Sequence, residues 1–183
     1  MGTRNLTMVI NHQGEKKVAQ YGQWDGYPSG VGVCVLAFLR NKELFQKFKS
    51  NLSKVRFLDE EGLDKEFLES YDKNAPKWSG EPDNRTEEQK KWFSDYNTRD
   101  LAEQVLTNIA NSIDEEIVLT DRESTAKGDG WVEYSYVINL KDNTLGVYGH
   151  VDCDPMKVYS LDNLPEDTEF ISDIESIEQS QEE

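Results

Sequence analysis

The sequence has few of the residues that mark a secreted, membrane-spanning or disulfide-rich protein. It contains only two cysteines, Cys34 and Cys153, far apart in the chain, so neither a disulfide framework nor a CxxC motif is indicated. No run of apolar residues reaches the length of a membrane span, and residues 1–10 do not have the long apolar core of a signal peptide. We therefore expect a cytoplasmic protein with no membrane partner.

Basic residues are also scarce. The 183 residues include 20 Lys and Arg against 36 Asp and Glu, which gives a net charge of −16 and a pI of about 4.5. Such a charge repels the phosphate backbone, so direct binding of duplex DNA is not expected. It attracts basic protein surfaces and accelerates encounter with them. The alternative is that the acidity only keeps the protein in solution.

What the sequence does contain is enough apolar and aromatic material for a folded core. Four Trp, eight Tyr and seven Phe argue against general disorder. Residues 5–10 and 16–23 are predicted to form a hairpin, and residues 131–140 and 145–151 a second one, with a further strand at 156–161. This pattern predicts an α+β fold, with an antiparallel sheet built from N- and C-terminal hairpins and helices packed on one face.

Apolar residues at helical spacing occur through most of the middle of the chain. Ser29 is predicted to cap a first helix in which Cys34 is buried, and a second helix contains Leu44 and Phe48. Residues 55–97 predict short helices, one beginning at the capping sequence after Thr86. A longer helix is predicted from a cap near Thr98 to Ile113. We expect one domain over residues 1–164, followed by an acidic helix or tail over residues 165–183.

Two groups of residues invite a catalytic interpretation. His150, Asp152 and Asp154 would share one face of a strand and are weak candidates for binding a divalent cation, although a solvated strand end is the preferred explanation. An N-terminal nucleophile would require removal of both Met1 and Gly2 to expose a threonine. No nucleophile elbow or phosphate-binding glycine loop occurs, and no cofactor is expected.

Two acidic triplets are candidates for contacts with a basic partner. Their alternative explanation is that they are solvated faces, because carboxylates are abundant throughout the chain. In the functional interpretation, their spacing imitates that of phosphates and occupies a basic groove. The six residues are Asp59, Glu60, Glu61, Asp114, Glu115 and Glu116.

Residues 23–30, QWDGYPSG, form the most unusual stretch, which we call the WDGYP block. Its Trp24 and Tyr27 lie among turn-forming residues, where an aromatic side chain either fills the core or anchors a contact with a partner. Asp25 is suited to capping the turn. With Arg4 and Gln23, these three residues complete the set of candidate binding residues.

The opening MGTR together with the WDGYP block resembles a family of small phage and prophage proteins. The resemblance covers about the first forty residues, and Gln23 stands where the family is expected to have a histidine, which argues against a general base there. Length, acidity and the mixed α+β pattern also resemble a type II anti-CRISPR protein of streptococcal prophages. That resemblance implies action in the host-cell cytoplasm on the RNA-guided nuclease or its guide RNA complex.

Two functional hypotheses follow. In the first, the chain is a phage-encoded acidic inhibitor that binds a basic host defence nuclease, as an anti-CRISPR protein does. In the second, it is a small phage hydrolase or nuclease that uses the His150 group or a processed N-terminus. The acidity and the resemblance favour the inhibitor.

Overall fold

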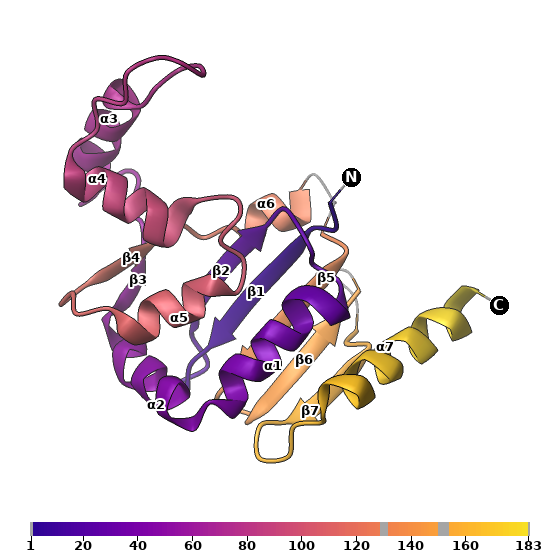
Figure 1. The fold of residues 1–183 in the computed structure, drawn as a ribbon. Coiled ribbons are helices and arrows are strands. Elements are labelled where there is room, and N and C mark those ends of the chain that lie inside the picture. The colour runs from indigo at the N-terminus through magenta and orange to yellow at the C-terminus, as the bar shows by residue number, and fades with distance from the viewer. Residues whose placement is uncertain (1, 129–131, 150–153, 183) are drawn as a thin grey trace.

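The chain folds into a five-stranded sheet covered by helices (Figure 1). The computed structural model describes residues 2–128, 132–149 and 154–182. The strand order is β2–β1–β5–β6–β7, and the predicted α+β class is confirmed. The strands are β1 (Asn5–Ile10), β2 (Lys16–Gly22), β5 (Tyr134–Asn139), β6 (Thr144–Tyr148) and β7 (Lys157–Ser160).

A parallel pairing in the middle of the sheet joins its N- and C-terminal parts. β1 pairs with β2, β5 with β6 and β6 with β7 in the antiparallel sense, as predicted. β1 and β5 instead run parallel, with Asn5 beside Tyr134 and Ile10 beside Asn139. A parallel pair needs a long crossover, and all the helices of the middle of the chain belong to that crossover.

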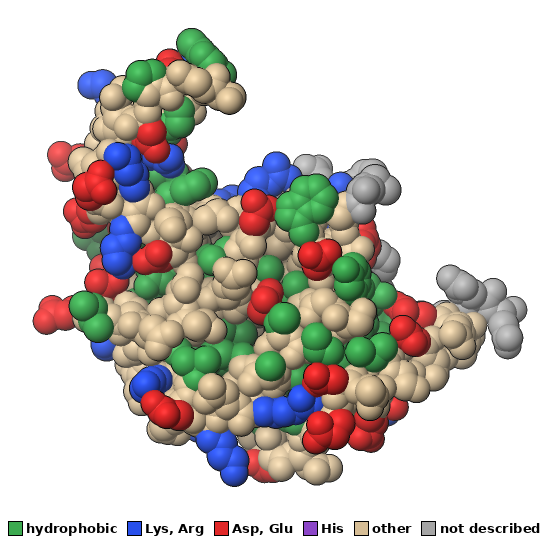
Figure 2. Space-filling model, in the orientation of Figure 1, with side chains coloured by type: hydrophobic (Ala, Val, Ile, Leu, Met, Phe, Trp, Pro, Cys, Tyr) green, Lys and Arg blue, Asp and Glu red, His purple; other side chains and the backbone are tan. Residues whose placement is uncertain are grey.

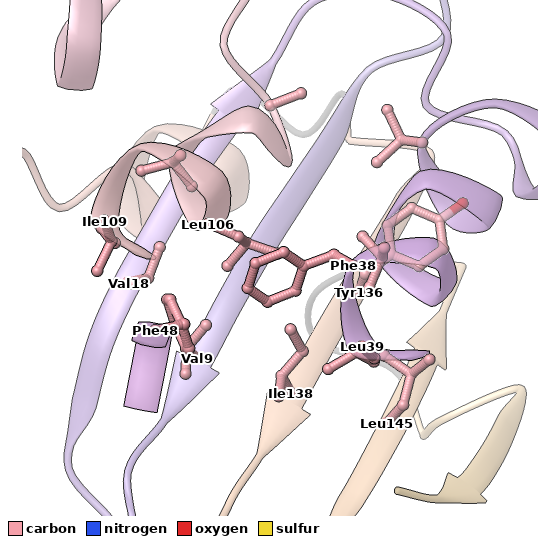
Figure 3. Packing of buried hydrophobic residues seen from close by; sticks show 14 of the residues in the cluster. Val9, Val18, Phe38, Leu39, Phe48, Leu106, Ile109, Tyr136, Ile138 and Leu145 are labelled. Carbon is pink, nitrogen blue, oxygen red and sulfur yellow. The ribbon is translucent and has the colours of Figure 1, made fainter. Parts of the chain in front are cut away.

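Four helices cover one face of the sheet and enclose the core (Figures 1 and 3). They are α1 (Val33–Arg40), α2 (Lys42–Asn51), α5 (Gln104–Asn111) and α7 (Asp167–Glu182). Alternation along the strands sends one set of side chains toward the helices. Figure 3 shows the sheet residues Val9, Val18, Tyr136, Ile138 and Leu145 packed against the helical residues Phe38, Leu39, Phe48, Leu106 and Ile109.

The short helix α6 (Glu123–Gly128) contributes to a smaller cluster on the opposite face. Leu6 and Val9 point to opposite faces of β1, because side chains alternate along a strand. Leu6 packs with Ala126 and Val132, and all three side chains are buried. The helical layer is therefore mainly, but not entirely, on one side of the sheet.

A second, two-stranded parallel sheet carries a projecting part that we call the arm, residues 58–97 (Figures 1 and 2). The sheet pairs β3 (Val55–Phe57) with β4 (Ile117–Leu119), and neither of these short strands was predicted. The arm contains α3 (Lys65–Asn74), α4 (Glu87–Trp92) and the π-helical turn η3 (Phe93–Asn97). The start of α4 was predicted: Thr86 and Gln89 form a capping box.

Three local predictions are wrong. Ser29 does not cap α1; it lies exposed inside a π-helical turn, η1 (Pro28–Gly32), that precedes this helix. Cys34 is exposed rather than buried, because α1 turns its Val35, Leu36 and Leu39 side toward the core. The helix predicted from Thr98 to Ile113 is shorter at both ends.

The helix predicted from Thr98 to Ile113 is shorter for a different reason at each end. Ala102 adopts a positive φ of 46°, which interrupts helical geometry, so α5 begins only at Gln104. At the other end, Ser112 is extended and Ile113 is 94% exposed. Asn51 fixes this end of the helix, since its side-chain amide donates to the carbonyls of Ile109 at 2.9 Å and Ser112 at 3.0 Å.

Candidate functional site

The WDGYP block forms the connection between β2 and α1 and passes close over the start of β1. The Gly26 amide donates to the Thr3 carbonyl at 2.9 Å, and the buried Tyr136 hydroxyl donates to the Gly26 carbonyl at 2.7 Å. The side-chain amide of the fully buried Asn5 donates to the Trp24 carbonyl at 3.3 Å. The block is thus fixed by contacts with the centre of the sheet.

Within the block, the backbone turns sharply at Asp25. Its φ of 53° lies in the left-handed region, which aspartate tolerates better than most residues. The Val31 amide donates to the Asp25 carbonyl at 2.9 Å and closes the turn. The Tyr27 hydroxyl donates to the Asp25 carboxylate at 3.1 Å, and this hydrogen bond raises the pKa of Tyr27. Asp25 therefore lies within the turn, and its carboxylate accepts from the Tyr27 hydroxyl.

The two aromatic side chains of the block point outward. Trp24 is 54% exposed and Tyr27 is 40% exposed, so the interpretation of these residues as core-filling is wrong. The Trp24 ring packs directly on Gly2, where a Cβ would lie 2.1 Å from a ring carbon. We call Trp24 and Tyr27 the aromatic patch, a pair of large side chains presented by a rigid backbone.

The structure brings the remaining candidates of the N-terminal set to the same place. The Gln23 side-chain carbonyl accepts hydrogen bonds from the Tyr21 hydroxyl, at 2.9 Å, and from the Arg99 guanidinium. The Arg4 carbonyl accepts from the Glu133 amide at 3.0 Å, which places Arg4 where β1 meets the start of β5. All five predicted residues thus surround the start of β1.

The two acidic triplets lie elsewhere, at the second sheet. One follows β3 and the other precedes β4, and because these strands are parallel the triplets lie at opposite ends of the pair. Glu60, Glu61 and Glu115 are exposed, as the solvated-face interpretation predicts. Glu116 instead pairs with Arg56, so the triplets do not form one continuous acidic surface.

Arg56 is the centre of an ion-pair network that sequence reasoning missed. Its guanidinium donates to both carboxylate oxygens of Asp64, at 2.6 and 2.9 Å, and its Nε lies 2.8 Å from Glu116. These hydrogen bonds hold the pKa of both carboxyl groups below their usual range. Glu116 is sixty residues from Arg56 in the chain, and no local spacing in the sequence signals such a pair.

The same network borders a cavity of about 380 Å³ between the second sheet and the arm, which we call the arm cavity. Phe67, Trp92 and Tyr96 provide its aromatic wall. Charged residues at the cavity are more exposed; the side chains of Lys91 and Asp114 are 60% and 42% exposed. The cavity combines a partly buried aromatic surface with a charged rim open to solvent.

On the other side of this aromatic wall, the arm already binds a guanidinium of its own. Arg85 lies with its guanidinium carbon 5.0 Å from the ring centre of Tyr71 and 4.8 Å from that of Phe93. It donates to both oxygens of Asp83, at 2.8 and 2.6 Å. These hydrogen bonds lower the pKa of Asp83 to about 2. Arg85 thus ties the long loop of the arm to its helices.

Arg85→Lys is expected to lower the free energy of unfolding by about 1.5 kcal/mol, because lysine can neither place a planar group against the two rings nor bind the carboxylate through two nitrogens. Urea unfolding followed by circular dichroism measures the change. Arg99→Lys is the control, since Arg99 is exposed, and its expected change is below about 0.5 kcal/mol. Equal losses in the two variants would show that the contacts of the guanidinium with the two rings and with Asp83 contribute nothing.

The candidate cation site lies largely outside the described residues. This holds for His150 and Asp152, whereas Asp154 is described and exposed. Among residues 2–128, 132–149 and 154–182, no group of three or more His, Cys, Asp or Glu side chains is arranged to hold a metal ion. The hypothesis of a cation site at His150 stays a prediction.

Within the part of the chain that the structure describes, no helix has both the length and the apolar character needed to cross a membrane. No family model, no curated protein and no solved structure matches this chain.

Proposed function

We propose that the chain is a phage-encoded acidic inhibitor that binds a host defence nuclease, namely the RNA-guided type II nuclease or its guide RNA complex. The observation that supports a binding function best is the aromatic patch. Tryptophan and tyrosine are enriched among the residues that dominate protein–protein affinity, above all where the backbone is already rigid before binding. Trp24 and Tyr27 are exposed on a connection that hydrogen bonds fix to the sheet.

The charge supports a basic partner. A net charge of −16 attracts positively charged surfaces over a distance of several ångströms and raises the rate of encounter. The last part of the chain has no Lys or Arg after Lys157, and the exposed carboxylates of α7 include Glu169 and Glu175. Figure 2 shows acidic side chains distributed widely over the visible face.

The nucleic-acid channel of an RNA-guided nuclease has the required chemistry. Such nucleases hold the guide–target duplex in a positively charged channel and recognise it through its backbone. An acidic domain can compete for that channel while its aromatic patch makes the contacts that give affinity. The resemblance of the N-terminal forty residues to phage proteins is the reason for choosing a host defence enzyme among basic partners.

The proposal is tested by DNA cleavage with a guide-loaded streptococcal type II nuclease while this protein is titrated. We expect inhibition to be complete near an equimolar ratio, with the guide RNA intact on a denaturing gel. Trp24→Ala is expected to weaken inhibition at least tenfold, because loss of a central aromatic contact costs about 2 kcal/mol. Trp78→Ala is the matched control, since Trp78 is 67% exposed but lies on the arm.

Two results would overturn the proposal in different ways. Inhibition at far less than equimolar amounts, with a shortened guide, would replace the binding inhibitor by the hydrolase or nuclease alternative. No inhibition at a large excess would exclude this nuclease as the target.

A further inference from the structure

The arm cavity has the size and the lining of a site for a small group rather than of a packing defect. Its volume of about 380 Å³ lies within the range of about 300–1,000 Å³ that is typical of ligand sites. Trp92 is held in place from three sides: its indole N–H donates to the Val118 carbonyl at 3.0 Å, and its ring meets Phe67 and Tyr71 edge-on. The aromatic wall is therefore preformed.

The charges around the cavity do not balance. Four carboxylates line it together with two cations, Arg56 and Lys91. Both cations are already used, since Arg56 pairs with Asp64 and Glu116, and Lys91 lies 2.9 Å from Asp95 and 3.4 Å from Asp114. Glu88 lines the cavity from the first turn of α4 and forms no ion pair with any described residue. The cavity thus offers negative charge that the chain itself does not neutralise.

The cation that best suits such a wall is a guanidinium. Arg85 lies against the rings of both Tyr71 and Phe93, and Tyr71 is in turn in contact with Trp92, so one side of a single aromatic cluster already holds this group. A guanidinium is planar, is more weakly hydrated than an ammonium, and binds carboxylates through two nitrogens. Tryptophan provides the most favourable face for a cation among the aromatic side chains.

We infer that the arm cavity is a binding site for the guanidinium of an arginine side chain presented by a protein partner, with Trp92 as the aromatic surface and Glu88 as the counter-charge. The inference rests on the proposed function only in assigning the arginine to a protein partner; binding of the guanidinium itself does not depend on it. The site lies on the arm, away from the aromatic patch, and provides a second, chemically different contact.

The test is titration of the full chain with N-acetyl-arginine-N-methylamide, followed by the indole N–H signals of the tryptophans in two-dimensional NMR. We expect the Trp92 signal to shift with a Kd on the order of 1 mM, while the signals of Trp24 and Trp78 stay in place. The capped citrulline analogue, which has the same shape and no charge, is expected to bind at least tenfold more weakly. Equal binding of the two probes, or no Trp92 shift, would overturn the inference.

A matched pair of variants tests the role of the carboxylate. Glu88→Gln is expected to raise the Kd of the capped arginine about fivefold, whereas Glu87→Gln leaves it unchanged. Glu87 is the neighbouring residue on α4, with a side chain 93% exposed and paired with Lys90 at 3.0 Å. Equal effects of the two variants would exclude a specific contact with Glu88.

The source of the guanidinium is distinguished by comparing the capped probe with free L-arginine. Equal or tighter binding of the capped form supports a side chain in a protein, and clearly tighter binding of free arginine would overturn that assignment in favour of a small metabolite. The experiments give different results depending on which of the two proposals is wrong. Nuclease inhibition without a Trp92 shift would overturn the cavity site alone, and a Trp92 shift without inhibition would overturn the nuclease target alone.

Discussion

Gly30→Ala is expected to destabilise the protein by about 3 kcal/mol, at the upper end of the usual cost of adding a methyl group to a filled site. A Cβ at this position would lie 2.2 Å from the Asp25 carbonyl oxygen. That oxygen belongs to the backbone and accepts the Val31 amide, so it cannot move aside without opening the turn. The measurement is the midpoint of urea or thermal unfolding.

The neighbouring substitution Ser29→Ala is the control. Ser29 lies in the same turn, but its side chain is exposed, and the expected change is within about 0.5 kcal/mol. The comparison also tests the function of the block, because distortion of the turn moves the aromatic patch. Unfolding midpoints that agree for the two variants would show that the turn relaxes easily and is not the rigid support described above.

Phe170→Ala is expected to cost about 4 kcal/mol, which is typical of the loss of a fully buried phenylalanine. The side chain is 0% exposed; its ring lies 5.5 Å from that of Tyr159, and it fills the space beside Gly32. Together with Ile174, also 0% exposed, it places α7 in the main core. The free energy of unfolding by chemical denaturation gives the value.

Ile113→Ala serves as the comparison, because Ile113 is an apolar residue that is 94% exposed. Its expected effect is below about 0.5 kcal/mol. If Phe170→Ala changed the free energy of unfolding as little as Ile113→Ala, the packing of α7 would contribute little to the stability of the core. If the loss is large, residues 165–183 cannot be removed without exposing the face of the core that α1 and β7 share with this helix.

The sequence predicted those parts of the fold that depend on neighbouring residues. The two hairpins follow from alternation and from turn residues such as Gly14, whose positive φ of 84° suits the turn after β1. The parallel pairing of β1 with β5 was not predicted, because the sequence of a strand does not indicate which distant strand it pairs with. The same reason explains why β3 and β4, each only three residues long, were missed.

In the candidate site, too, features of neighbouring residues were predicted and contacts between distant residues were not. The residues of the WDGYP block were predicted to lie together, since they are adjacent in the chain, but their exposure depends on Gly2 and β1 passing beneath them. The arm cavity was not predicted. Its acidic and aromatic residues come from the arm and from the segment just before β4, and contacts between distant residues, such as the hydrogen bond from Trp92 to the Val118 carbonyl, bring the two segments together.

The parallel pairing of β1 with β5 also determines the order in which the protein can fold during synthesis. β1 and its antiparallel neighbour β2 leave the ribosome before β5, because the helices of the crossover lie between them in the sequence. A two-stranded hairpin is marginally stable by itself, and contacts between distant residues form slowly because a long loop must close first. The edge of β1 that pairs with β5 therefore stays unpaired until the whole crossover has been made, and an unpaired strand edge is the feature for which a nascent chain depends on chaperones to avoid aggregation.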